Sequence, residues 1–193
     1  MLKKLLVSLL SAFLCISVVA EPESQLNENQ NLNDVKIDEN GNVFVAPLKY
    51  HISSDSTAEV IKDYSYEKLE SVVIPSKILV SVTGIVESAF FNCHSLTSIE
   101  IPSSVTSIGQ SAFMGCSGLA SIEIPSRVTD IYVYAFRGCS GLTHIVIPSS
   151  VTSIGYEAFY LCENLDVVID NSKENVTVYE DAFYRCKSVK FLK

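Results

Sequence analysis

Five of the six cysteines in this sequence recur at a fixed spacing, and thiols are the side chains here with the widest chemistry. The steps between them are 23, 23, 23 and 24 residues. They stand at Cys93, Cys116, Cys139, Cys162 and Cys186. A thiolate can bind zinc, form a disulfide or act as a nucleophile, and each role needs a different arrangement in space.

The regular spacing opposes all three roles. If each step is one coil of a repeat, the cysteines form a straight file with about 4.8 Å between neighbouring backbones. A file cannot surround a zinc ion tetrahedrally, and parallel Cα–Cβ bonds oppose the dihedral angle of a disulfide. His94 follows Cys93 directly, so in a turn the two side chains point apart and form no catalytic dyad. We therefore expect free, buried thiols that act as small apolar core groups, with no metal and no cofactor.

Serine, glutamate and histidine side chains form a second candidate set. Ile99 and Ile101 alternate with Ser98 and Glu100, which predicts a short strand with its isoleucines inward. The outward positions of successive strands begin with Ser71 and Val73. Those of the next three strands give a candidate binding face on the concave side, which consists of Ser98, Glu100, Ser121, Glu123, His144 and Val146. Glutamates side by side favour a cationic partner or a bound cation, and a merely solvated face is the alternative.

Catalysis on this face is poorly supported. Glu100, Glu123 and His144 would need a site that excludes water and holds a nucleophile or an oxyanion donor, and an open sheet offers neither. We therefore expect a protein that is not an enzyme. A hydrolase that uses these three residues is the enzymatic alternative.

A third candidate set follows the Ala-Phe pair of each repeat. The residues that directly follow these pairs should stack on one another and form an aromatic and apolar stripe, which consists of Phe91, Met114, Arg137, Tyr160 and Tyr184. Four more tyrosines lie close to it in the repeat, namely Tyr132, Tyr134, Tyr156 and Tyr179. This composition is enriched at protein interfaces. The alternative is that the rings lie flat over the edge of the coils as part of the outer core.

A tandem repeat must position all three sets. The stretch Ile101–Cys116, IPSSVTSIGQSAFMGC, returns one period later as Ile124–Cys139, IPSRVTDIYVYAFRGC. A fixed period of this length is typical of a solenoid, in which each coil buries its apolar side against its neighbours. Pro102 ends the strand, Val105 and Ile108 return to the interior from the opposite side, and the Ala-Phe turn closes the coil.

The rest of the chain divides by composition. Residues 1–20 have a basic start, an apolar run and a small-residue end, which predicts a secretory signal peptide cleaved near Ala20. Residues 21–42 are acidic and rich in Asn, which predicts a flexible spacer. Alternating residues from Val43 and a second short strand around Ala58 predict a capping segment over 43–71, followed by the repeats over 72–193.

Charge excludes some partners. Without Lys3 and Lys4 the chain keeps 12 basic and 22 acidic side chains, a net charge of −10. Such a surface repels nucleic acid and anionic lipid headgroups, so we expect neither nucleic-acid binding nor membrane insertion of the mature chain.

The pattern C-x-x-L-x-x-I-x-I-P-x-x-V-x-x-I-x-x-x-A-F, present in Cys93–Phe113 and Cys116–Phe136, resembles the leucine-rich repeat of the BspA-like bacterial and protist surface proteins. The resemblance covers Val43–Lys193. It implies a leucine-rich repeat solenoid with short parallel strands on the concave side and short strands and helical turns on the others. It also implies a secreted or cell-surface module that binds an extracellular protein in adhesion. The alternative to an adhesion module is a structural envelope protein that self-associates through its open solenoid end. We expect the chain to be a monomer or to self-associate weakly.

The last repeat departs from the pattern. Asp170 replaces the strand-ending proline, and Val189 stands where leucine is expected, which leaves the register of this repeat uncertain by about one residue. The sequence Asn175-Val-Thr would accept a glycan in a eukaryotic secretory route.

Overall fold

The computed structural model describes residues 36–38, 40, 42–53, 57–78 and 80–193. The predicted signal peptide and most of the predicted spacer lie outside these residues. The end of the spacer is described, and Lys36–Ile37 form strand β1, which pairs antiparallel with β2 (Val43–Val45). The last residues of the 21–42 segment therefore belong to the first sheet.

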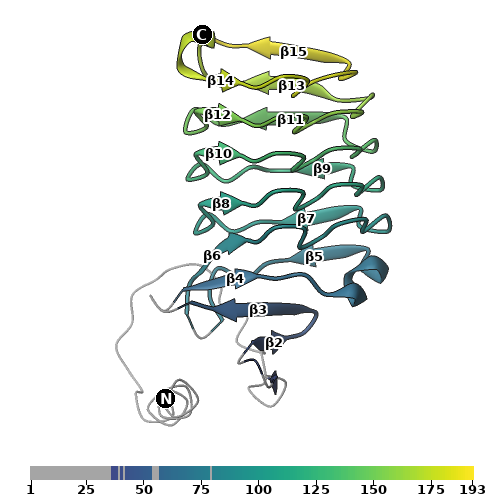
Figure 1. Ribbon diagram of the computed structural model, residues 1–193, viewed down its shortest axis with the longest axis vertical. Coiled ribbons are helices and arrows are strands. Elements are labelled where there is room, and N and C mark those ends of the chain that lie inside the picture. The colour runs from purple at the N-terminus through teal and green to yellow at the C-terminus, as the bar shows by residue number, and fades with distance from the viewer. Residues whose placement is uncertain (1–35, 39, 41, 54–56, 79) are drawn as a thin grey trace.

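The described residues form a β-solenoid of about six coils, where the five recurring Ala-Phe and cysteine positions predict about five repeats and an N-terminal cap. Its period near 23 residues is the predicted one. The coils stack in one column toward the C-terminus (Figure 1). One side carries a nine-stranded sheet in the order β1-β2-β3-β4-β6-β8-β10-β12-β14. Its further strands are β3 (Leu48–Ile52), β4 (Ala58–Val60), β6 (Val82–Ile85), β8 (Ser107–Ile108), β10 (Asp130–Ile131), β12 (Ser153–Ile154) and β14 (Thr177–Val178). Strands are antiparallel up to β4 and parallel from there on.

The opposite strands form what we call the strand face, and it is divided. The first parallel sheet contains β5 (Ser71–Val73), β7 (Ser98–Glu100) and β9 (Ser121–Ile122). The second contains β11 (His144–Ile147), β13 (Asp166–Ile169) and β15 (Ser188–Phe191). The repeat predicts one long ladder here, so the separation of β9 from β11 is a difference from the expected sheet. The remaining connections are mostly turns, with short 3-10 helices η2 (Tyr64–Lys68) and η3 (Lys173–Asn175).

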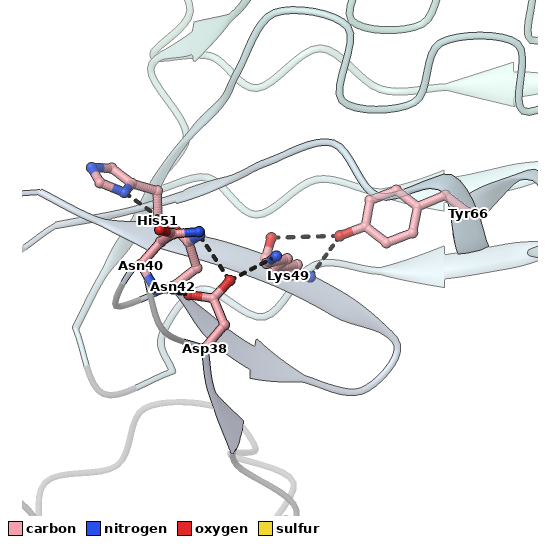
Figure 2. A network of polar contacts seen from close by, with 6 residues as sticks. All are labelled: Asp38, Asn40, Asn42, Lys49, His51 and Tyr66. Atoms are coloured by element: carbon pink, nitrogen blue, oxygen red, sulfur yellow. Dashed lines mark hydrogen bonds and ion pairs between the residues drawn. The ribbon is translucent and has the colours of Figure 1, made fainter.

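Tyr66 joins the N-terminal hairpin to the solenoid. Its hydroxyl oxygen accepts a hydrogen bond from the backbone N–H of Lys49 at 2.6 Å, and its ring stacks on Phe90 with centroids 5.3 Å apart. Figure 2 shows the same Lys49 reaching Asp38, where its Nζ lies 2.8 Å from Oδ2. This contact and the Asn42 side chain hold the pKa of Asp38 well below its usual range. The β1–β2 turn, the hairpin and the first coil are thus tied together.

Stacked phenylalanines fill the interior. Phe90, Phe113, Phe136 and Phe159 are fully buried, and neighbouring rings lie nearly parallel. Their centroids are 5.2, 5.3 and 5.1 Å apart, and Phe183 continues the file at 5.6 Å from Phe159. Parallel rings at this distance give both area burial and direct ring contact. Each coil therefore obtains its core from its neighbours.

Two residues per coil adopt the left-handed backbone conformation that closes the Ala-Phe turn. One stands immediately before the alanine, as at Ser111 (φ 54°) and Tyr134 (φ 58°). The other stands immediately before the cysteine, where Gly115 has φ 77°. A Cβ at Gly115 would lie 2.2 Å from Asn92 Oδ1, so any other residue there would displace the Asn92 side chain. Leu161 and Arg185 adopt the same conformation at the equivalent position, so the conformation alone does not demand glycine.

The register of the last repeats is settled by the pairing of β13 and β15. Val167 pairs with Ile145 and Val189 pairs with Val167, so each of these two steps is 22 residues. Val189 therefore takes the first inward strand position and not the leucine position that the pattern assigned to it. In the preceding repeat these positions are Val167 and Leu165, so the displacement is two residues, more than the one residue that the sequence left uncertain.

Candidate functional site

The cysteine file is a core feature, as its spacing predicts. All five thiols are free, four are buried and Cys186 is partly buried. Four of them donate a hydrogen bond to the phenylalanine carbonyl of the preceding coil at 3.0 to 3.2 Å, a contact that the sequence does not indicate. Burial raises the pKa of Cys116 and Cys162 to about 12 and that of Cys93 to about 11. These groups stay protonated near neutral pH and do not supply a nucleophile.

The first half of the strand face presents exposed polar and acidic side chains. Ser71, Ser98 and Ser121 lie in register on β5, β7 and β9, and Val73 lies beside Glu100. Glu123 follows β9 directly and is exposed. Among the described residues, no ion pair includes Glu100 or Glu123.

The second half of the strand face carries residues that the sequence analysis missed. His144 lies in register with Asp166, and Val146 lies in register with Val168. Lys187 Nζ and Ser188 Oγ each donate to Asp166 at 2.6 Å. The Lys187 bond first, and the Ser188 bond second, hold the pKa of Asp166 below its usual range. A paired carboxylate therefore stands where the first half has unpaired ones.

One signal could have found Asp166. Its strand begins directly after Leu165, whereas Thr143 separates Leu142 from His144 in the preceding repeat. That missing residue moves Asp166 into the outward row beside His144. A count of the residues between the leucine and the strand would have placed it.

The predicted stripe forms a continuous set of ring contacts in its second half. Tyr160 and Tyr184 stack with centroids 4.9 Å apart. The guanidinium carbon of Arg137 lies 4.8 Å from the Tyr160 ring centroid and 5.4 Å from that of Tyr134. Phe91, Met114, Arg137 and Tyr160 are half-buried, whereas Tyr184 is 49% exposed. The rings are thus neither wholly core nor freely solvated.

Two charged residues support the stripe, and sequence reasoning missed both. Glu157 is buried beneath it, and its Oε2 forms an ion pair with Arg137 Nη1 that lies outside hydrogen-bond geometry. The hydrogen bond to the Glu157 carboxylate raises the pKa of Tyr156 to about 12. At the other end, Lys62 Nζ lies 5.0 Å from the Phe91 ring centroid. The three preceding repeats carry Ser or Tyr before the Ala-Phe pair, so the acidic residue that first appears at this position is the signal that marks Glu157.

Metal binding, a catalytic dyad and a membrane span can each be checked against the described residues. Within the described ranges, no group of three or more His, Cys, Asp or Glu side chains is arranged to hold a metal ion. His94 Nδ1 lies 3.2 Å from Ser117 Oγ and takes no part in a dyad with Cys93. In the same part of the chain, no helix is both long and apolar enough to cross a membrane.

Comparison with known families supports this architecture. The model of the BspA type leucine-rich repeat region matches residues 55–190 in six copies. No curated protein matches the chain at a significant level.

Solved structures of bacterial leucine-rich repeat proteins are similar over most of the chain. The leucine-rich repeat protein of T. pallidum is 33% identical with a TM-score of 0.67, over 76% of this chain and 70% of that one. One from Bacteroides ovatus is 30% identical with a TM-score of 0.64, over 76% of this chain but only 40% of that one. One from Bacteroides capillosus is 26% identical with a TM-score of 0.55, over 79% of this chain and 99% of that one.

Proposed function

The chain belongs to the BspA-type leucine-rich repeat family, and on this premise we propose that it is a secreted or cell-surface module for adhesion to proteins of a host or of other cells. Leucine-rich repeat domains are protein-interaction modules, and their long regular surfaces suit that role. We further propose that the protein is not an enzyme. Its buried, protonated thiols and open strand face support this part of the proposal.

Arg137 is the residue that favours the stripe over the strand face as the binding surface. Its guanidinium lies between the rings of Tyr134 and Tyr160 and against the buried Glu157 carboxylate, so its position is fixed before any partner arrives. Its side chain remains 33% exposed. Arg and Tyr are the residue types that most often dominate binding energy, and an anchor held in place loses less conformational freedom on binding. The stripe is therefore the proposed interface with the adhesion partner.

Location outside the cell is supported by two features of the sequence. Residues 1–20 have the pattern of a signal peptide, and the rest of the chain is strongly acidic. Expression of the full chain, followed by N-terminal sequencing of the exported product, tests this part. A mature N-terminus near Glu21 is the expected result, and retention of residues 1–20 inside the cell would contradict it.

A capture experiment tests whether the stripe is the interface with the adhesion partner. Residues 21–193 serve as bait in extracts of host and microbial surface proteins, and Tyr160→Ser/Tyr184→Ser is compared with the natural chain. We expect the double change to weaken the captured complex by about 2 kcal/mol, roughly thirtyfold in Kd. The matched control is Ile37→Ser/Leu192→Ser, which removes two exposed apolar side chains elsewhere. Equal loss in both variants, or none in either, would refute the stripe as the interface.

A further inference from the structure

A row of four outward side chains that the adhesion stripe does not include crosses the strand face from its first half to β11, the first strand of its second half. Val73 and Glu100 lie in register on β5 and β7, Glu123 follows β9, and Val146 lies on β11 in the next coil. The two valines are 62% and 47% exposed. The row therefore has an acidic centre with an apolar residue at each end.

The acidic centre is uncompensated within the described residues. No ion pair there includes Glu100 or Glu123, although Asp166 and Asp170 farther along the same face are paired with Lys187 and Lys193. Like charges on neighbouring strands destabilise each other, and a positive charge brought between them relieves that repulsion. Charge complementarity thus favours a cationic group at the centre of the row.

An arginine fits this centre better than a lysine. Its planar guanidinium presents several N–H donors in a fixed fork, so it can donate to two carboxylates at once. Paired parallel strands lie about 4.8 Å apart, which places Val73 roughly 7 Å from the point midway between the glutamates. β9 and β11 are not paired, but Phe113 and Phe136, which precede them in consecutive coils, stack with centroids 5.3 Å apart, so Val146 lies at a similar distance on the other side. Two residues of an extended peptide span about 6.8 Å. An extended segment crossing the strands therefore places alternate side chains at the spacing of this row.

We propose that the row Val73, Glu100, Glu123 and Val146 binds an extended protein segment in which an arginine is flanked, two residues away on each side, by an apolar residue. The arginine lies between the two carboxylates, and the apolar side chains cover the valines. This inference goes beyond the proposed adhesion function, because the stripe lies on a different segment of each coil. The outcome of the capture experiment on the stripe neither supports nor contradicts it.

A peptide titration followed by two-dimensional NMR tests the proposal. The protein is the chain from residue 21, which contains all of the described fold, and the probe is the peptide acetyl-Thr-Val-Thr-Arg-Thr-Val-Thr-amide. We expect shifts at the backbone amides of the four row residues. Replacing the arginine of the peptide by glutamine should weaken binding about tenfold, as expected for loss of one close interfacial charge pair. Replacing its valines by serine should weaken binding by a smaller factor.

Protein variants assign the site. Glu100→Gln/Glu123→Gln should weaken binding of the arginine peptide about tenfold and remove most of its salt dependence. The matched control is Glu87→Gln/Glu180→Gln, which removes the same charge from two exposed positions off the strand face. Tyr160→Ser/Tyr184→Ser should leave peptide binding unchanged, which separates this site from the stripe.

Three results would overturn the proposal. One is the absence of shifts at the row with millimolar peptide, and another is equal binding of the arginine and glutamine peptides. The third is equal weakening by the two glutamine variants, which would show attraction by net charge alone. Shifts at Glu100 and Glu123 with calcium chloride but not with peptide would count against it as well, because they would identify a cation site.

Discussion

On the first half of the strand face, Glu100 on β7 and Glu123 just after β9 form no ion pair with any basic side chain that the structure describes. On the second half, Asp166 and Asp170 each meet a lysine contributed by the next coil. Both halves rest on the same file of buried phenylalanines. The comparison teaches that the repeat fixes the interior and leaves the outward charges free, so one half can neutralise itself while the other keeps charge available for a partner.

The largest expected effect tests whether the cores beneath the two halves of the strand face are equally important for stability. Phe113→Ala and Phe136→Ala should each lower the free energy of unfolding by about 3–5 kcal/mol, because each leaves a cavity between stacked rings. Urea denaturation of both variants measures this. Costs that differ by much more than about 1 kcal/mol would show that the halves differ in their cores as well as on their surfaces.

A smaller effect should follow when the first half is made to resemble the second. Glu123→Lys places a cation on the strand beside Glu100, so repulsion becomes attraction and the free energy of unfolding should rise by about 1 kcal/mol at low salt. Denaturation at low and high salt measures the gain, which salt should reduce. Glu180→Lys is the control, because it makes the same charge change off this face. A gain of equal size in the control would show that net charge explains it.

The smallest effect concerns the second half. Lys187 holds the pKa of Asp166 below its usual range, so Lys187→Gln should raise that pKa toward the ordinary value. A lowered folded-state pKa gives stability above the unfolded-state value, and this stability is lost as the pH falls through the folded-state value. The variant should therefore lose less stability on acidification than the natural chain. NMR titration of the Asp166 carboxyl measures the pKa, and Lys190→Gln in the same strand is the control. An unchanged pKa would show that the Lys187 contact is not formed in solution.

Sequence periodicity was sufficient for the interior. Period and alternation predicted the coil, the inward Ile99, the buried thiols and the outward Glu100, because these depend on spacing within one repeat. The signal peptide remains a prediction, since residues 1–20 lie outside the described part of the chain. The binding roles of the strand face and of the stripe also remain predictions.

Contacts between coils could not be derived in the same way. The Arg137–Glu157 pair joins residues 20 positions apart on adjacent coils, and Asp166 meets Lys187 only because the strand is one residue early. The division between β9 and β11 follows from no pattern in the residues. Such features depend on how neighbouring coils are displaced, which a single repeat does not specify.

The file of buried thiols also allows the local opening of individual coils to be measured. Five coils contain one cysteine each, and the sulfurs of four of them are buried, so a thiol reagent reaches these four only when the coil separates from its neighbours, whereas the partly buried Cys186 reports on the last repeat. Five labelling rates, resolved by mass spectrometry of peptide fragments, would therefore give five separate opening equilibria along one column. The cysteines of the repeat thus supply a built-in measure of how unfolding spreads from coil to coil.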